Sequence, residues 1–448
     1  MTVGFLHHQR FPLVGVWAGV SLGLPNRWAM ASPPVPQVLR VRERMGLMRR
    51  LLRDRLCTVL PAAMRETGFD MWLVICQEDD YDPVFRTLVP PDSWCPILQM
   101  LVFFDAGEGG IERINLSMSD FGDLYHKPWK GHREEEQWAL LRRIVEERNP
   151  RRIGINTGRT QWAAGGLTHN LYTKLCAALP EKYLSRLECA EPLVIRWAAT
   201  LTGEEMHLYE DVVRLARYLI ASCYAYEVVK IGETTTEDLE WHYWQKASDL
   251  GLEVAFRPFF SVWRRKADRE RHGATDRVIR PGDLLHCGVG IRYLGLNSDH
   301  QQVAYVLRPG EDDAPEGLKV LLREANRLQD IYMAEFRAGL TGNELLANIL
   351  HRARAEGIPN PRVYSHSLGH FLHEPGPLIG LPWEQKDCGD RGRVELAPNY
   401  AFTMELSVSG AVEEWEGEEI TLGVEEDVVF TEDGCCLIEG RQTDFYVV

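Results

Sequence analysis

The stretch that decides the fold of this chain is Gly282-Asp283-Leu284-Leu285-His286-Cys287-Gly288-Val289-Gly290-Ile291-Arg292-Tyr293-Leu294-Gly295-Leu296-Asn297-Ser298-Asp299. Its first half is an apolar run typical of a strand, and period-two alternation would place His286 and Gly288 on the same face. Asp283 would then point to the opposite face. The carboxylate Asp299 follows eleven residues after Gly288. The stretch therefore predicts a strand that is followed by the acidic residue Asp299.

Three histidines gather in a second stretch, His366-Ser367-Leu368-Gly369-His370-Phe371-Leu372-His373-Glu374-Pro375-Gly376-Pro377. A neutral imidazole is a good ligand for borderline metal ions, and a second imidazole can donate a hydrogen bond to a carbonyl or an oxyanion. Taken alone, the histidines would also suit a solvated surface. We interpret His366 and His373 as candidate functional residues and His370 as a structural one.

Two further carboxylates lie in strand-like surroundings. Glu405 interrupts the run Phe402-Thr403-Met404-Glu405-Leu406, and a buried carboxylate demands a partner such as a cation. Glu425 begins an acidic run, residues 425–427, which by itself is more typical of a solvated turn. By itself, neither carboxylate indicates a metal site.

Over residues 195–448 these motifs resemble the pita-bread metallopeptidases, the family of methionine aminopeptidase, aminopeptidase P and prolidase. The first stretch is similar to the family's D-x-G-(x)n-D segment, and the second to its H-G-x-G-x-x-x-H-E-x-P stretch. The resemblance implies that Asp299 and Glu425 bridge two metal ions, while His366 and Glu405 complete the shell of one ion. His373 would then hydrogen-bond to substrate.

Two further histidines have roles that the resemblance suggests. His272 lies near the position of a substrate-contacting histidine in aminopeptidase P and prolidase-like proteins. His286 could replace a missing ligand, and the alternative is a histidine of the core or of a strand end. Both roles are hypotheses.

Gly288 departs from the pattern, because the resemblance implies an aspartate there that chelates one of the two ions. The chain keeps four ligands and loses the chelating one, so the second subsite should be weak or empty. The first subsite would still hold one ion. We expect one or two divalent ions in total, with Mn²⁺ favoured and Zn²⁺, Co²⁺ or Fe²⁺ as alternatives.

The leading functional interpretation is a metal-dependent hydrolase that resembles Xaa-Pro aminopeptidase or dipeptidase and cleaves short peptides, impaired or mononuclear because of Gly288. The metal would polarise the scissile carbonyl and lower the pKa of bound water, and Glu405 would shuttle the proton. His373 and His272 would steady the substrate. Two alternatives stay open: a creatinase-like hydrolase that breaks a C–N bond of a small amide without metal, and a catalytically inactive, peptide-binding pita-bread protein.

The expected fold class is α+β, with a creatinase-like N-terminal α/β domain followed by a C-terminal pita-bread domain. Residues 37–195 alternate strands with helices, including one amphipathic helix over residues 38–67. Residues 196–448 begin with a capping box at Thr202 and Glu205. Residues 1–36 are expected to be an N-terminal extension or a signal segment.

Composition narrows the partners and the compartment. The 448 residues carry a formal charge of −15, which argues against nucleic acid or an anionic membrane as the partner. The sequence contains no run of eighteen apolar residues, so we expect no membrane span. Ten cysteines without a C-x-x-C pair indicate reduced thiols and a cytoplasmic location, whereas residues 1–31 would direct export if they are a signal peptide. The expected partners are a short peptide or small amide and a second copy in a homodimer.

Overall fold

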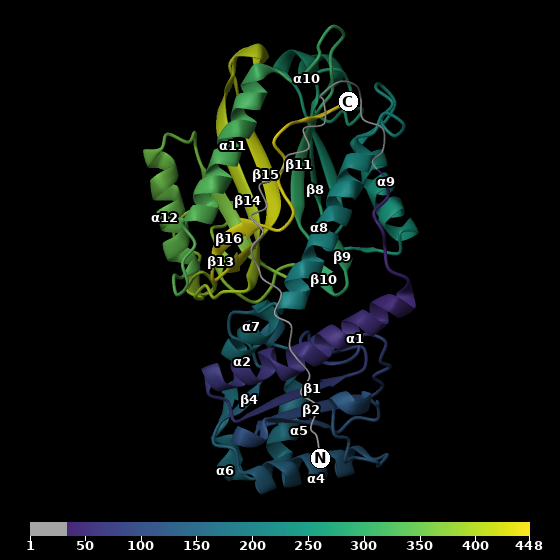
Figure 1. The fold of residues 1–448 in the computed structure, drawn as a ribbon, viewed down its shortest axis with the longest axis vertical. Helices are drawn as coiled ribbons and strands as arrows, with labels where there is room; N and C mark the ends of the chain where they lie inside the picture. Colours follow the sequence, from purple (N-terminus) through teal and green to yellow (C-terminus); the bar gives the residue numbers. More distant parts are fainter. Residues whose placement is uncertain (1–33) are drawn as a thin grey trace, which may run out of the picture.

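The computed structural model describes residues 34–448, so the predicted signal peptide lies outside the described residues. The N-terminal part is built on one mixed sheet, which occupies the lower half of Figure 1. Its strands are β1 (Met71–Gln77), β2 (Leu98–Asp105), β3 (Ile111–Asn115), β4 (Ile153–Ile155) and β5 (Leu187–Cys189), in the order β3-β2-β1-β4-β5. Its helices are α1 (Val41–Cys57), α2 (Val59–Thr67), α3 (Phe85–Leu88), α4 (Glu134–Arg148), α5 (His169–Ala178), α6 (Glu181–Leu184) and α7 (Glu191–Ala199).

The helix predicted over residues 38–67 is divided in two at Thr58, which ends α1 and precedes α2. Pro61 explains the break, because it has no N–H to donate to the carbonyl of Cys57 and its ring collides with that carbonyl. The continuous-helix prediction was therefore wrong, although both halves are helical.

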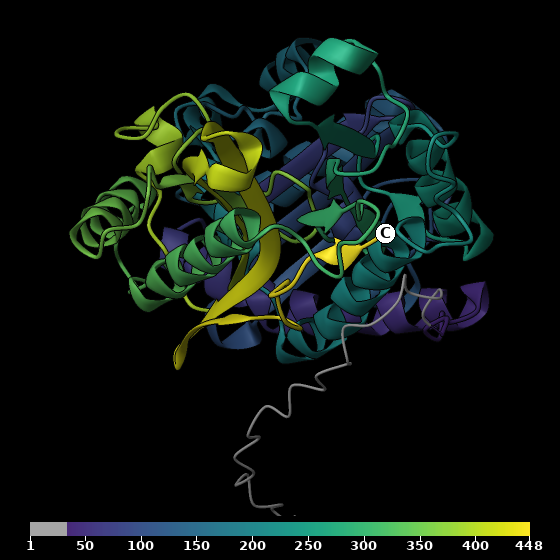
Figure 2. The ribbon, with the colours of Figure 1, turned by 90° about the horizontal axis from the view of Figure 1, so that it is seen from above.

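The C-terminal part folds around a curved sheet, whose long yellow strands bend across the view in Figure 2. Its strands are β7 (Phe259–Trp263), β8 (Leu284–Val289), β11 (His300–Tyr305), β12 (Arg362–Leu368), β13 (Leu378–Ile379), β14 (Tyr400–Val412), β15 (Glu418–Thr431), β16 (Gly434–Leu437) and β17 (Tyr446–Val447). The main order is β13-β12-β14-β15-β11-β8-β7, with β16 beside β15 and β17 beside β11. A small sheet has the order β10-β9-β6, from β6 (Glu253–Val254), β9 (Ile291–Tyr293) and β10 (Leu296–Asn297).

Helices cover one face of the curved sheet and leave the other face to the candidate site. The helices on the covered face are α8 (Gly203–Cys223), α9 (Thr236–Asp249), α11 (Glu316–Ala334) and α12 (Gly342–Ala355), and the short helices α10 (Lys266–His272) and α13 (Gly389–Gly392) complete this part. Along β14, Met404 and Leu406 belong to the core cluster that includes residues of α11 and α12. The alternating positions Glu405 and Ser407 line a cavity on the opposite face. Strand alternation therefore decides which side chains of β14 reach the site.

Residues 282–299 form β8, β9 and β10, with a break at Gly290. A Cβ at Gly290 would lie 2.2 Å from the carbonyl oxygen of Ser298, so the close approach of these two segments requires glycine. The return of the chain through β10 places Asp299 directly before β11. The predicted strand is therefore real but shorter than the run of apolar residues.

Helices α1 and α7 lie at the junction of the two parts (Figure 1). Leu51 of α1 packs in a core cluster with residues of α8, while Trp197 of α7 packs in an N-terminal cluster. The capping box at Thr202 and Glu205 is present at the start of α8, as predicted. The predicted domain boundary near residue 195 stays a prediction.

No helix within residues 34–448 combines the length and the apolar composition that crossing a membrane requires. The ten cysteines, from Cys57 to Cys436, are all free thiols. The structure thus agrees with the prediction of reduced cysteines.

Candidate metal centre

Three of the four predicted metal ligands meet on the open face of the curved sheet. Asp299, His366 and Glu425 each offer a ligand atom, and these atoms all lie within 4.8 Å of one another. The three residues are buried, and His366 Nε2 lies 3.9 Å from Asp299 Oδ2. They come from three strands or strand ends that are far apart in the sequence: the start of β11, β12 and β15.

The protonation state of His366 suits a metal ligand. Burial, with the nearby His373, lowers the pKa of His366 to about 3, so the ring is neutral near pH 7. Its Nδ1 lies 3.0 Å from the carbonyl oxygen of Ser367. In the tautomer whose Nδ1–H donates to this carbonyl, Nε2 carries a free lone pair on the side of the ring that lies near Asp299.

The two carboxylates of the group lack a positive partner. Burial raises the pKa of Asp299 and of Glu425 well above their usual range, the charge of Glu405 adds to the effect on both, and the charge of Asp299 adds to the effect on Glu425. Glu425 Oε1 is buried and has no hydrogen-bond partner. Because buried carboxylates require a compensating charge or a proton, this donor set of two carboxylates and one imidazole fits one divalent ion.

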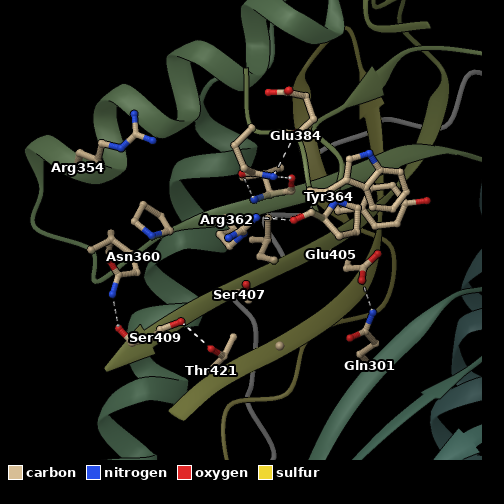
Figure 3. A pocket seen from close by; sticks show the side chains of 18 of the residues that line it. Gln301, Arg354, Asn360, Arg362, Tyr364, Glu384, Glu405, Ser407, Ser409 and Thr421 are labelled. Carbon is tan, nitrogen blue, oxygen red and sulfur yellow. Dashed lines mark hydrogen bonds between the residues drawn. The ribbon is translucent and has the colours of Figure 1, made fainter. Parts of the chain in front are cut away.

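Glu405, the fourth predicted ligand, lies outside this group and contacts Gln301 instead. Gln301 Nε2 donates to Glu405 Oε1 at 2.6 Å and to Glu425 Oε2 at 3.0 Å, and the first bond is drawn in Figure 3. Burial raises the pKa of Glu405 to about 7, against the opposing effect of the Gln301 hydrogen bond. Sequence reasoning missed Gln301, although its position two residues after Asp299 puts it on the same face of an extended chain.

Gly288 lies on the open face, beside Gln301 in the neighbouring strand. An ideal Cβ at Gly288 would lie 2.1 Å from Cζ of Phe259, so the phenyl ring occupies the space of the missing side chain. His286 lies on the same face, as alternation predicted, with its Nε2 3.0 Å from Gln301 Oε1. Its ring stacks on Trp263 with centroids 6.0 Å apart, and it is not part of the three-residue group.

The other predicted histidines lie at different distances from the centre. The ring of His373 is exposed and its centroid lies 4.6 Å from that of His366, so it can face a substrate. His370 Nε2 lies 3.1 Å from Glu205 Oε1, which fits the structural role predicted for it. His272, at the end of α10, lines a separate cavity of about 270 Å³, and the structure does not bring it to the three-residue group.

A large groove, which includes Gln301 and Glu405, follows the open face of β12, β14 and β15 (Figure 3). Its volume is about 1220 Å³, above the usual range of about 300–1,000 Å³ for small-molecule sites. Glu405 and Gln301 lie at one side of the groove in Figure 3, and Arg354 and Asn360 lie toward the other. The lining is mainly polar and includes Arg362, Tyr364, Glu384, Lys386, Ser407, Ser409 and Thr421.

An arginine that no motif predicted completes the surroundings. The charge of Arg391 adds to burial in lowering the pKa of His373. The Arg391 guanidinium lies 4.7 Å from the ring centroid of Trp162, which belongs to the N-terminal part. Among residues 34–448 no side chain forms an ion pair or hydrogen bond with this guanidinium. It is therefore a cation that is available to an anionic group of a substrate.

Glu374, next to His373, leads to a testable pH dependence. The carboxyl group is buried, its Oε1 has no partner, and burial raises its pKa to about 8. In the unfolded chain the pKa returns to about 4.5. Between pH 4.5 and 8 the folded state therefore holds a proton that the unfolded state has lost, so the free energy of unfolding should fall as pH rises, by up to about 1.4 kcal/mol per pH unit.

We expect Glu374→Gln to remove this contribution, because glutamine is neutral at every pH in the window. Urea unfolding at pH 6 and pH 8 measures the slope for the parent and the variant. Glu432→Gln, at an exposed position, is the matched control and should keep the parental slope. Equal slopes for Glu374→Gln and the parent would contradict the raised pKa.

Known proteins resemble the chain in sequence and in fold. The family model described as metallopeptidase family M24 matches residues 208–432. The "Uncharacterized peptidase YqhT" of Bacillus subtilis (strain 168) is 28% identical over 169 residues, 36% of this chain and 41% of the relative, so the match spans only part of that protein's length.

Two solved structures give the fold. The X-Pro aminopeptidase from Thermotoga maritima MSB8 has a TM-score of 0.60 at 17% identity, covering 86% of this chain and 100% of that one. The Xaa-Pro dipeptidase from Bacillus anthracis has a TM-score of 0.57 at 16% identity, covering 89% and 100%. These structures confirm the expected α+β, pita-bread fold, and at such identities they carry the fold alone.

Proposed function

Because the chain belongs to metallopeptidase family M24, we propose that it is a metal-dependent hydrolase of short peptides, of the Xaa-Pro aminopeptidase or dipeptidase type. The observation that carries the proposal is the buried group of Asp299, His366 and Glu425 beside a long polar groove. We propose Mn²⁺ as the ion, because two carboxylates and one imidazole suit a hard-to-intermediate divalent metal. Zn²⁺, Co²⁺ and Fe²⁺ are the alternatives.

The side chains around the three-residue group have different roles in the proposed hydrolysis. A divalent ion held by Asp299, His366 and Glu425 would supply Lewis acidity for the scissile carbonyl and the attacking water. Glu405, with a pKa of about 7, takes the proton from water and returns it to the leaving amine nitrogen. The exposed ring of His373 donates to the oxygen of the tetrahedral carbon.

The free cation near His373 suggests how a peptide is oriented. Arg391 can pair with a carboxylate of the substrate, since a guanidinium forms charge-assisted hydrogen bonds with carboxylates. The stacked Trp162 would limit the mobility of Arg391. Arg391 therefore supports a short peptide with a free carboxylate as the substrate class, and we propose proline after the scissile bond because the similar structures are an X-Pro aminopeptidase and an Xaa-Pro dipeptidase.

Three further predictions from the sequence concern His272, the oligomeric state and the compartment, and each can be tested directly. The substrate-contacting role of His272 is tested by its alanine variant, which should raise KM if the role is real. The homodimer is tested by size-exclusion chromatography with light scattering. The compartment is tested by locating the full-length chain after cell fractionation.

A second candidate function follows from the contacts of Gln301. Its amide nitrogen donates hydrogen bonds to Glu405 and Glu425, and it thereby occupies a place between the two carboxylates that a metal cation could otherwise take. This arrangement favours a creatinase-like hydrolase that breaks a C–N bond of a small amide without metal. The unsatisfied Glu425 Oε1 and the neutral His366 favour the metal-dependent reading.

The proposed activity is tested on the full chain after its metal has been stripped with a chelator. Stripped protein and protein reloaded with one of the four ions are incubated with Ala-Pro, Ala-Pro-Ala, the matched peptides Ala-Ala and Ala-Ala-Ala, and creatine. Mass spectrometry quantifies the products. We expect the loaded protein to cleave the prolyl peptides at least about 100-fold faster than the stripped protein, since Lewis-acid stabilisation supplies several kcal/mol.

Other results of this assay would support one of the alternative functions instead. Turnover of creatine that survives chelation would replace the first proposal with the metal-free hydrolase. Faster cleavage of Ala-Ala than of Ala-Pro would contradict the proline preference only. No turnover with any ion would contradict an enzymatic function, and calorimetry with the same peptides would then test peptide binding.

A further inference from the structure

The loss of a ligand at Gly288 is accompanied by two side chains that fill the vacated space. We propose that Phe259 and Gln301 close the second metal subsite, so that the centre accepts one divalent ion rather than two. This inference rests on the proposed metal-dependent function and specifies its stoichiometry. It also gives Gln301 a positioning role toward Glu405.

The register of the curved sheet brings the relevant residues into one row. Phe259 in β7 is paired with Gly288 in β8, and Gly288 is paired with Gln301 in β11. Gln301 is paired with Glu425 in β15, which is paired with Glu405 in β14. Directly paired residues of neighbouring strands project side chains to the same face, with Cβ atoms about 4.5–5.5 Å apart. A group that replaces the absent side chain of Gly288 must therefore come from its neighbours in this row.

Phe259 fills the Gly288 end of the row. Its Cζ and Cε1 atoms would lie 2.1 and 2.2 Å from a Cβ at Gly288. The ring also packs near His286, with centroids 6.1 Å apart. Phe259 is 44% exposed, but an apolar ring at this point offers no electron pair to a hard cation and occupies the place of a Cβ at Gly288.

Gln301 fills the middle of the row. Its Nε2 donates to one oxygen of Glu405 and one oxygen of Glu425, and its Oε1 lies 3.0 Å from His286 Nε2. The Glu425 oxygen is one that a second ion beside Gly288 would share, and His286 Nε2 is the nearby nitrogen that could replace the absent carboxylate. Since these two contacts are already hydrogen bonds of ordinary length, a second ion would have to break both.

The three-residue group is left free by this arrangement. Glu425 Oε1, the oxygen that Gln301 does not contact, has no hydrogen-bond partner, and His366 Nε2 lies near Asp299. One ion can therefore bind while Gln301 stays in place and holds Glu405 beside it. The first subsite, formed by Asp299, His366 and Glu425, can therefore accept an ion, whereas the second subsite is occupied by Phe259 and Gln301.

Because the side chains of Phe259 and Gln301 occupy the second subsite, introducing an aspartate at position 288 alone should not allow a second ion to bind. The full chain and its variants are loaded with Mn²⁺ or Zn²⁺, and native mass spectrometry counts the ions per chain, a readout independent of hydrolysis. We expect one ion for the parent and one for Gly288→Asp. The triple variant Gly288→Asp, Phe259→Ala, Gln301→Ala should bind one ion more than the parent.

A matched control replaces Phe259→Ala with Trp263→Ala in the triple variant. Trp263 lies on the same face of the same strand and also stacks on His286, but it is paired with Leu284 rather than Gly288. We expect this control to keep the parental count. Circular dichroism and the thermal midpoint of each variant verify folding, and a variant that does not fold is replaced by its Phe259→Leu or Gln301→Ser equivalent.

Each result decides the inference. Two ions in the parent, two in Gly288→Asp alone, or no gain in the folded triple variant would each overturn it. A gain in the Trp263 control would overturn the role of Phe259. A parent without any ion would overturn the proposed metal dependence, whereas the gain of one ion by the triple variant over the parent would still support closure by Phe259 and Gln301.

Discussion

Replacing His366 with alanine is expected to weaken the binding of the first divalent ion by more than about 100-fold. The loss of a residue that only supports a ligand already costs about 10- to 100-fold in affinity or activity, so the loss of a ligand itself should exceed it. His366 is the one nitrogen ligand of the group, and the remaining carboxylates of Asp299 and Glu425 repel each other. Peptide hydrolysis should fall with the affinity.

Isothermal titration calorimetry of the stripped protein with Mn²⁺ measures this loss, and the peptide assay measures the accompanying loss of turnover. His351→Ala is the matched control, because His351 is an exposed residue of α12 outside the site. It should bind the ion as the parent does. If His366→Ala kept the parental affinity while remaining folded, the proposed ligand set would be wrong.

Replacing Arg55 with alanine is expected to lower the free energy of unfolding by about 3–5 kcal/mol, the usual cost of breaking a buried ion pair. Arg55 is 2% exposed and its Nη1 donates to Glu205 Oε2 at 2.9 Å and to the carbonyl of Thr200 at 2.7 Å. Its Nη2 donates to the carbonyl of Trp197. Without the arginine, the buried carbonyls of Thr200 and Trp197 would lose this donor, and the Glu205 carboxylate would lose its positive partner and keep the hydrogen bond from the Thr202 N–H.

The same contact should be visible in the acid stability. Although burial favours the neutral form of Glu205, the charges of Arg55 and His370 hold its pKa at about 2. A carboxyl whose folded pKa lies below its unfolded value of about 4.5 stabilises the protein above pH 4.5. This contribution is lost as pH falls from 4.5 toward 2. The Arg55→Ala variant should lack this part of the acid transition.

Urea unfolding at pH 7 and pH 4 tests both statements, and Arg53→Ala is the control. Arg53 lies one half-turn away on α1 and pairs with Asp123 at the surface, with side chains 48% and 67% exposed. An exposed pair contributes about 0–1 kcal/mol, so this variant should unfold nearly as the parent does. Similar losses for the two variants would show that burial of the Arg55 pair does not govern the stability of the junction.

Much of the fold followed from local patterns. The capping box at Thr202 and Glu205 predicted the start of α8, and alternation predicted that His286 and Gly288 share a face. The helix over residues 38–67 was predicted without its break, because the periodicity of apolar residues outweighed the single proline at position 61. Gln301 could have been found by the same alternation from Asp299, whereas Arg391 carried no signal, since its neighbours in space come from other segments.

The sequence by itself determined the family, the α+β fold and the order of the candidate ligands, because these depend on spacing within short segments. It also determined that a carboxylate is absent at position 288. Only the tertiary structure decided what fills that place. The pairing of β7, β8, β11, β15 and β14 sets Phe259 against Gly288 and Gln301 against Glu405 and Glu425, and such contacts depend on the register between strands that lie far apart in the chain.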